Sequence, residues 1–206
     1  ALPSASIDAE LVRDTLTKGP GGIRVLLAPS SPEFADLVTA DHLGTIMREL
    51  RRTFDYIVVD TAPHLGELNL EAIELATRVI VVTALTIPAL KDTKLTLRVL
   101  ETLNIEPDRI LLALNRHNAH SEFNREAVER NLRFPIAVQI PHDSPTVSAS
   151  VNHGAPFVSA HPEAEISRSI GELVSRLVPV EAHAPAVAVP RTADHRRVRR
   201  FGFARG

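Results

Sequence analysis

The 206-residue chain contains no cysteine, no tryptophan, one methionine and one tyrosine. The absence of cysteine excludes disulfide bonds, thiolate-bound zinc and iron–sulfur clusters held by this chain, and it fits a reducing, cytoplasmic compartment. No run approaches the roughly 18 consecutive apolar residues that a membrane-spanning helix needs. The formal net charge of -2 favours neither nucleic acid nor an anionic surface, so any such attraction must come from local clusters of charge.

Apolar runs of strand length alternate with segments of helical spacing along most of the chain. The expected strands cover residues 23–28, 56–59, 79–82, 110–114 and 136–140, and the expected helices cover 7–17, 43–50, 68–76, 90–103, 122–132 and 163–177. This alternation predicts βαβ crossovers and a doubly wound α/β fold, with a mostly parallel sheet and helices on both faces. At least four strands, centred near Val25, Val58, Ile80 and Leu112, are expected in one sheet.

The composition changes at the C-terminal end of the chain. Residues 1–179 have the pattern of one globular domain, residues 180–190 form an Ala/Pro linker, and residues 191–206 form a basic tail that we expect to be disordered. The tail carries six arginines and two phenylalanines against one acid, Asp194. This cluster predicts reversible binding to an anionic membrane, and a solvated tail without a partner is the alternative.

Polar residues follow three of the predicted strands, where ligands bind in open parallel sheets. Asp60 ends the apolar run 56–59, and its carboxylate could hold hydrated Mg²⁺, or it could simply cap the next helix. Asn115 follows the run 110–114, and its side chain can donate to and accept from a purine edge, or it could be a turn residue. Pro141 and Asp143 follow the run 136–140, where Pro141 could serve only to end the strand.

These stretches together resemble the MinD/ParA-type P-loop ATPases, also known as the SIMIBI or deviant Walker A class. Residues 54–63 look like the family's Walker-B strand and switch II, and residues 140–156 look like its adenine-side loop and the helix after it. The resemblance implies ATP and Mg²⁺ as cofactors, with Asp60 as the catalytic residue that holds Mg²⁺ through water. It implies nucleotide contacts by Thr61, Pro63, Asn115, Arg116, Pro141 and Asp143.

The family's phosphate loop, Lys-Gly-Gly-x-Gly-Lys followed by Thr or Ser, has no counterpart in the sequence. Residues 18–22 contain three glycines, but they lack the Lys-Thr or Lys-Ser pair and precede a predicted strand, so they predict a turn. We therefore expect that the family's N-terminal phosphate-loop part is missing. The segment alone is not expected to hydrolyse ATP.

Residues 22–29 and 87–93 look most similar to the CpaE/TadZ branch of the family, which acts in pilus assembly. This resemblance implies a spatial regulator that positions pilus assembly or the division site. It also implies a homodimer, a pilus-assembly or polar-localisation protein as partner, and a cytoplasmic protein that could lie peripherally at the membrane. Nucleic acid is not favoured as a partner. A non-catalytic scaffold or dimerisation module on the same fold is the alternative.

Overall fold

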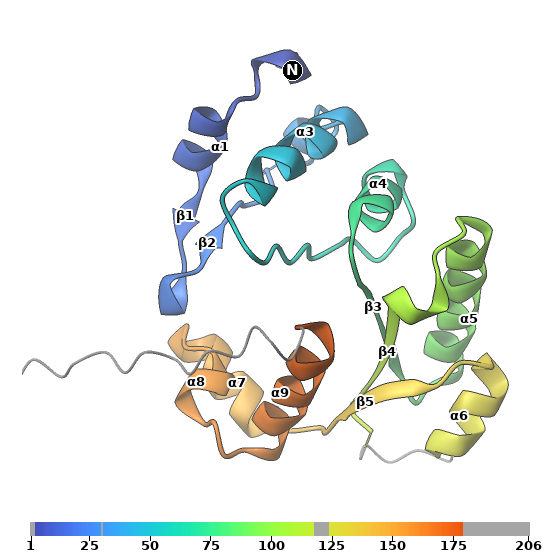
Figure 1. Ribbon diagram of the computed structural model, residues 1–206. Helices are drawn as coiled ribbons and strands as arrows, with labels where there is room; N and C mark the ends of the chain where they lie inside the picture. Colours follow the sequence, from blue (N-terminus) through green and yellow to red (C-terminus); the bar gives the residue numbers. More distant parts are fainter. Residues whose placement is uncertain (1–2, 30, 118–123, 179–206) are drawn as a thin grey trace, which may run out of the picture.

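The computed structural model describes residues 3–29, 31–117 and 124–178, in two parts (Figure 1). The predicted linker and tail, 180–190 and 191–206, lie outside these residues. The N-terminal unit contains α1 (Ala9–Thr15), β1 (Thr17–Lys18), β2 (Arg24–Val25), α2 (Pro32–Ala35), α3 (Ala40–Arg51) and α4 (Glu67–Leu75). The sheet part contains β3 (Val79–Ala84), α5 (Ile87–Thr102), β4 (Ile110–Asn115), α6 (Arg125–Leu132), β5 (Ile136–Ile140), α7 (Ser144–His153), α8 (Phe157–Ala160) and α9 (Glu165–Leu177).

The sheet has the strand order β3-β4-β5, and both pairs are parallel. The strands β3 and β4 pair along their whole length, from Val79 opposite Ile110 to Ala84 opposite Asn115. An irregularity between Leu112 and Ala113 shifts the register of β5 by one residue. The predicted α/β fold with a parallel sheet is confirmed.

Helices cover both faces of this sheet, α5 and α6 on one face and α9 on the other (Figure 1). Alternate residues of β4 divide between the faces, because successive side chains in a strand point in opposite directions. Leu112 and Leu114 pack towards α5 and α6, whereas Ala113 packs with Leu173 of α9. Both faces of β4 are therefore buried, which explains its uninterrupted apolar sequence.

The N-terminal unit has a smaller core of its own, built by α1 and α3. Val12, Met47 and Leu50 are buried there, and Phe54 and Ile57 pack against them. Asp8 caps α1 by accepting a hydrogen bond from the Leu11 amide at 2.8 Å, and Thr39 begins α3 in a capping box. These caps and the apolar stripes place the helices close to their predicted positions.

The prediction of at least four strands in one sheet is wrong for two of them. Of the run 23–28, only β2 forms a strand, and it pairs antiparallel with β1 in a separate two-stranded hairpin. The run 56–59 belongs to no strand, and Tyr56 and Val58 are exposed. Neither run has a neighbouring strand to which its backbone can hydrogen-bond in the parallel sheet, so the apolar pattern alone does not produce a strand. None of the helices within the described ranges has the length and apolarity to cross a bilayer.

Candidate nucleotide-binding site

The carboxyl ends of β4 and β5 lie next to each other at one edge of the sheet. Ala84, Asn115 and Ile140 occupy one row of the register, so the residues that follow them emerge on the same side. The amide of His117 donates to the carbonyl of Ile140 at 3.1 Å and joins the two loops. Asn115 and Pro141 are therefore neighbours at this edge, as predicted from a parallel sheet.

The loop after β4 turns sharply at its first residue. Arg116 has a φ of 55°, in the left-handed region, and its side chain is exposed. Pro141 is buried next to it, where the ring ends β5. The half-buried amide of Asn115 and the exposed guanidinium of Arg116 make a polar surface that could contact a planar, hydrogen-bonding ligand.

Asp143 caps the N-terminus of α7. Its Oδ1 accepts from the amide of Thr146 at 3.1 Å. Hydrogen bonds from the side chain and the backbone of Thr146 lower the pKa of the Asp143 carboxyl, and charge interactions with His142 and His161 contribute less. The carboxylate of Asp143 is thus engaged by the first turn of α7.

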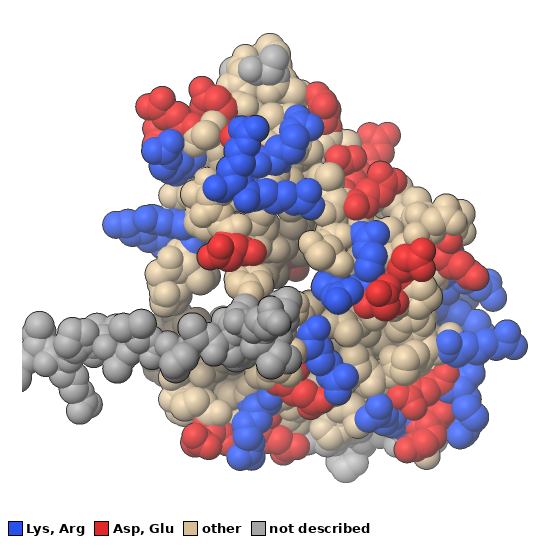
Figure 2. Space-filling view, viewed as in Figure 1, with Lys and Arg blue, Asp and Glu red and all other residues tan. Residues whose placement is uncertain are grey.

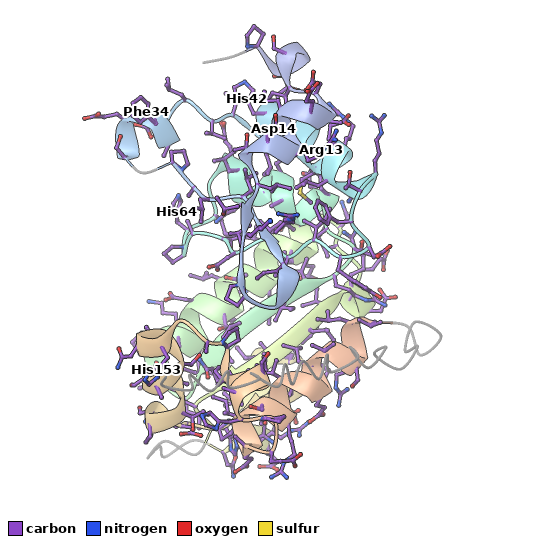
Figure 3. The ribbon with its side chains drawn as sticks, turned by 90° about the vertical axis from the view of Figure 1, so that its left-hand side faces the viewer. Arg13, Asp14, Phe34, His42, His64 and His153 are labelled. Carbon is purple, nitrogen blue, oxygen red and sulfur yellow. The ribbon has the colours of Figure 1, made fainter. Side chains whose placement is uncertain are left out.

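Asp60, Thr61 and Pro63 lie in a separate exposed loop that leads into α4. The side-chain amide of Asn69 holds this loop by donating to the carbonyl of Ala62 at 2.8 Å and to that of His64. Figure 3 labels His64 in this loop and His153 in α7, and both lie on the same side of the molecule. The run 56–59 before Asp60 belongs to no strand, so Asp60 does not end a strand of the sheet as the sequence predicted.

Two stabilising contacts of the fold were not predicted from the sequence. Asn69 anchors the Asp60 loop. In the sequence it stands out only as an asparagine in the first turn of a predicted helix. The hydroxyl of Thr93 donates to the hydroxyl of Thr83 at 2.8 Å in the core, and it ties the start of α5 to the end of β3. A threonine among valines in the run 79–83 was the available signal for this buried pair.

The site offers one carboxylate for a metal ion. The described residues contain no cluster of three or more histidine or acidic side chains that could hold a metal by themselves. Hydrated Mg²⁺ does not need such a cluster, because one carboxylate together with phosphate oxygens and water suffices. The exposed carboxylate of Asp60 fits this role. The predicted turn at residues 18–22 is present between β1 and β2, with Lys18 still in β1 and with Gly21 and Gly22 at positive φ.

No family model matches the chain. In sequence it is similar to the septum site-determining protein MinD of Thermotoga maritima, with 27% identity over 165 residues, covering 76% of this chain and 60% of the relative. It is also similar to an uncharacterized ATP-binding protein of Methanocaldococcus jannaschii, with 25% identity over 168 residues, covering 81% and 62%. The chain thus spans about three fifths of the length of these relatives.

Solved structures of the same kind share the fold. A ParA family ATPase from Chlorobium tepidum matches with a TM-score of 0.77 and 19% identity, over 85% of this chain and 72% of that chain. The MinD protein of Pyrococcus horikoshii, solved with Mg-ADP, matches with a TM-score of 0.71 and 23% identity, over 88% and 74%. The chain is thus similar in sequence to MinD proteins and shares the fold of MinD/ParA-type P-loop ATPases.

Proposed function

We propose that this chain is the switch and adenine-binding part of a MinD/ParA-like ATPase that acts as a spatial regulator. The shared register row of Ala84, Asn115 and Ile140 carries the proposal, because it gathers the strand-end polar residues at one edge. Two of the similar proteins are named as ATP-binding or septum site-determining. A relative solved with Mg-ADP supports ATP and Mg²⁺ as the cofactors.

Each residue of the site has a role in this proposal. Asp60 holds the hydration shell of Mg²⁺ and is the catalytic residue, and the loop with Thr61 and Pro63 responds to the terminal phosphate. On the other side, Asn115 and Arg116 contact the adenine, and the loop with Pro141 and Asp143 closes over it. Residues 1–206 contain no phosphate loop of the family's form, so no phosphate-binding role is assigned to the turn after β1.

Two cellular roles are proposed as alternatives. Similarity to septum site-determining proteins supports division-site selection, whereas residues 22–29 and 87–93 favour the placement of pilus machinery in the CpaE/TadZ manner. In both cases the active form is a homodimer that recruits a partner protein at the cytoplasmic face of the membrane. The arginine-rich residues 191–206 add a contact to anionic lipid.

The test is substitution of Asp60 in the protein that carries its phosphate loop. Asp60→Ala should abolish Mg²⁺-dependent ATP hydrolysis, because the hydrated metal loses its protein ligand. Asp55→Ala is the matched control, since Asp55 is an exposed acid of the same segment that lies five residues earlier. Unchanged hydrolysis in Asp60→Ala would remove the metal role of this residue. If the protein neither binds nor hydrolyses ATP, the scaffold function replaces the enzymatic one.

A further inference from the structure

A cavity of about 660 Å³ lies between α5 and the end of α6, at the start of β4. Because Ile110 begins β4 and Asn115 ends it, the cavity and the nucleotide-binding edge lie at opposite ends of the sheet. Cavities of roughly 300–1,000 Å³ are the usual size for small-molecule sites. The apolar lining comes from five side chains that are buried or half-buried: Leu97, Ile105, Ile110, Leu132 and Phe134. Volume and lining are thus those of a ligand site separate from the nucleotide-binding residues.

Charged side chains surround this cavity without pairing with one another. They are Lys94, Arg98 and Glu101 of α5, Glu106 in the loop after it and Arg133 at the end of α6. None of the five takes part in an ion pair within the described ranges, although Figure 2 shows basic and acidic side chains gathered over α5 and α6. At about 1.5 Å per residue, Glu101 lies about 4.5 Å along the helix axis from Arg98 and about 10 Å from Lys94. The α5 wall is therefore basic towards Lys94 and acidic towards Glu101.

Arg133 occupies a backbone conformation that favours glycine. It ends α6 in the left-handed region, with a φ of 52°. Glycine is preferred at such a position because it has no Cβ to clash with the backbone. Asn104, at a φ of 57°, lies on the α5 side of the cavity, and asparagine is one of the few other residues that tolerate this conformation. Arg133 is therefore less stable here than glycine would be, and the feature that it adds is a guanidinium at the cavity.

The rim of the cavity favours neither a pure anion nor a pure cation. Its three cationic and two acidic side chains give it a formal charge of +1. The C-terminal ends of α5 and α6, at Thr102 and Leu132, both lie at the cavity, and each carries roughly half a negative elementary charge. These contributions cancel, so a ligand with one charge would leave part of the rim without a partner. A ligand with both charges would meet both parts.

We propose that this cavity binds a small zwitterion with an apolar body, of the size and charge pattern of a dipeptide. Its carboxylate meets Lys94, Arg98 and Arg133, since a guanidinium can bind a carboxylate through two parallel hydrogen bonds. Its ammonium meets Glu101 and Glu106, and its apolar side chains cover the lining. The two residues of an extended dipeptide span about 7 Å, which lies between the separations of Glu101 from Arg98 and from Lys94. None of these residues belongs to the nucleotide-binding site, so the proposal is independent of ATP hydrolysis.

Titration of the full 206-residue chain with leucyl-phenylalanine, followed by the NMR shifts of backbone amides, tests the proposal. The amides of residues 104–106 and 132–134 should shift. Arg133→Gln should weaken the affinity about tenfold, because it removes a charged hydrogen bond to the carboxylate. Arg130→Gln is the matched control and should leave the affinity unchanged, since this exposed arginine of α6 does not line the cavity. Arg133→Gly should weaken binding as much as Arg133→Gln and yet retain or raise the midpoint of thermal unfolding.

Two analogues of the probe test the charge pattern. N-acetyl-leucyl-phenylalanine lacks the ammonium and leucyl-phenylalanine amide lacks the carboxylate, and each should bind about tenfold more weakly than the zwitterion. Equal affinity of either analogue would overturn the zwitterion in favour of an anionic or a cationic ligand. Absence of amide shifts would remove the site, and shifts that grow with protein concentration without the probe would identify a second copy of the chain as the occupant. A lower midpoint of unfolding in Arg133→Gly would give the arginine a structural role instead.

Discussion

Two segments of this chain share the tripeptide Ile-Val-Val and have different structures. Residues 80–82 lie in β3, hydrogen-bonded to β4, with Val81 buried beneath a helix. Residues 57–59 belong to no strand, and Val58 is almost fully exposed. The difference lies in the neighbours and not in the sequence, because a strand is stabilised by pairing and by packing across its faces.

The largest effect is expected in the core of the closed sheet. Leu112→Ala should lower the free energy of unfolding by about 3 kcal/mol, since it leaves a cavity at a side chain with 0% exposure. Val58→Ala should change it by less than about 0.5 kcal/mol, because that side chain is already in water. Urea denaturation of both variants measures the contrast. A similar loss in both would mean that residues 56–60 are buried in solution.

The second effect concerns the start of β5, where the charged side chains of α6 bind the backbone. Glu129 accepts from the amide of Ile136 at 2.8 Å, and Arg125 donates to the carbonyl of Ile136 at 2.8 Å. The hydrogen bond from Ile136 is the main cause that lowers the pKa of Glu129, and Arg125 adds to it. Because the pKa is lower in the folded state, this stability is present above the ordinary value of 4.5 and is lost as the pH falls below it.

Glu129→Gln should therefore lower the free energy of unfolding by about 1 kcal/mol at neutral pH. The difference from the parent chain should shrink as the pH falls below 4.5. Glu126→Gln, an exposed acid on the same helix, should show neither effect. Denaturant unfolding across this pH range provides the measurement. A difference that persists at the lowest pH would indicate that the charge of Glu129 is not the source of the stability.

An effect of similar size is expected at the start of α3 in the N-terminal unit. The hydroxyl of Thr39 accepts from the amide of His42 at 3.3 Å. Thr39→Ala should cost about 1 kcal/mol, and Thr39→Ser should retain most of the stability because serine also caps helices. Thermal unfolding followed by circular dichroism measures both. Equal losses for alanine and serine would show that the threonine methyl group, and not the cap, is responsible.

No effect on stability is expected from the basic tail. Replacing Arg196, Arg197, Arg199 and Arg200 with glutamine should leave thermal unfolding unchanged and should lower co-sedimentation with anionic vesicles at low salt. Each arginine contributes on the order of 1 kcal/mol near such a surface, so attachment is weak and sensitive to salt. Replacing Arg24, Arg98, Arg130 and Arg168, four exposed arginines outside the tail, with glutamine is the matched control for net charge. Unchanged sedimentation of the tail variant would exclude the membrane contact.

The sequence was most informative where its local patterns agree with packing on both sides. The strand 136–140 was predicted with its observed bounds, and the neighbouring positions of Asn115 and Pro141 followed from the rule for parallel sheets. The absence of a strand at residues 56–59 could not be predicted, because an apolar pattern does not show whether a neighbouring strand is present. The register shift after Leu112 and the anchoring of the Asp60 loop by Asn69 also depend on contacts distant in sequence.

Two arginines, one from the N-terminal unit and one from the sheet part, donate hydrogen bonds to the C-terminal end of α4. Nη2 of Arg51, in α3, donates to the carbonyl of Leu75, and Nη2 of Arg109, just before β4, donates to the carbonyl of Ala76. These acceptors are consecutive in the chain, so the N-terminal unit and the sheet are attached to one short piece of backbone. The C-terminal end of α4 thus links the N-terminal unit to the sheet, because its last carbonyls, which have no partner within the helix, accept hydrogen bonds from arginines of both parts.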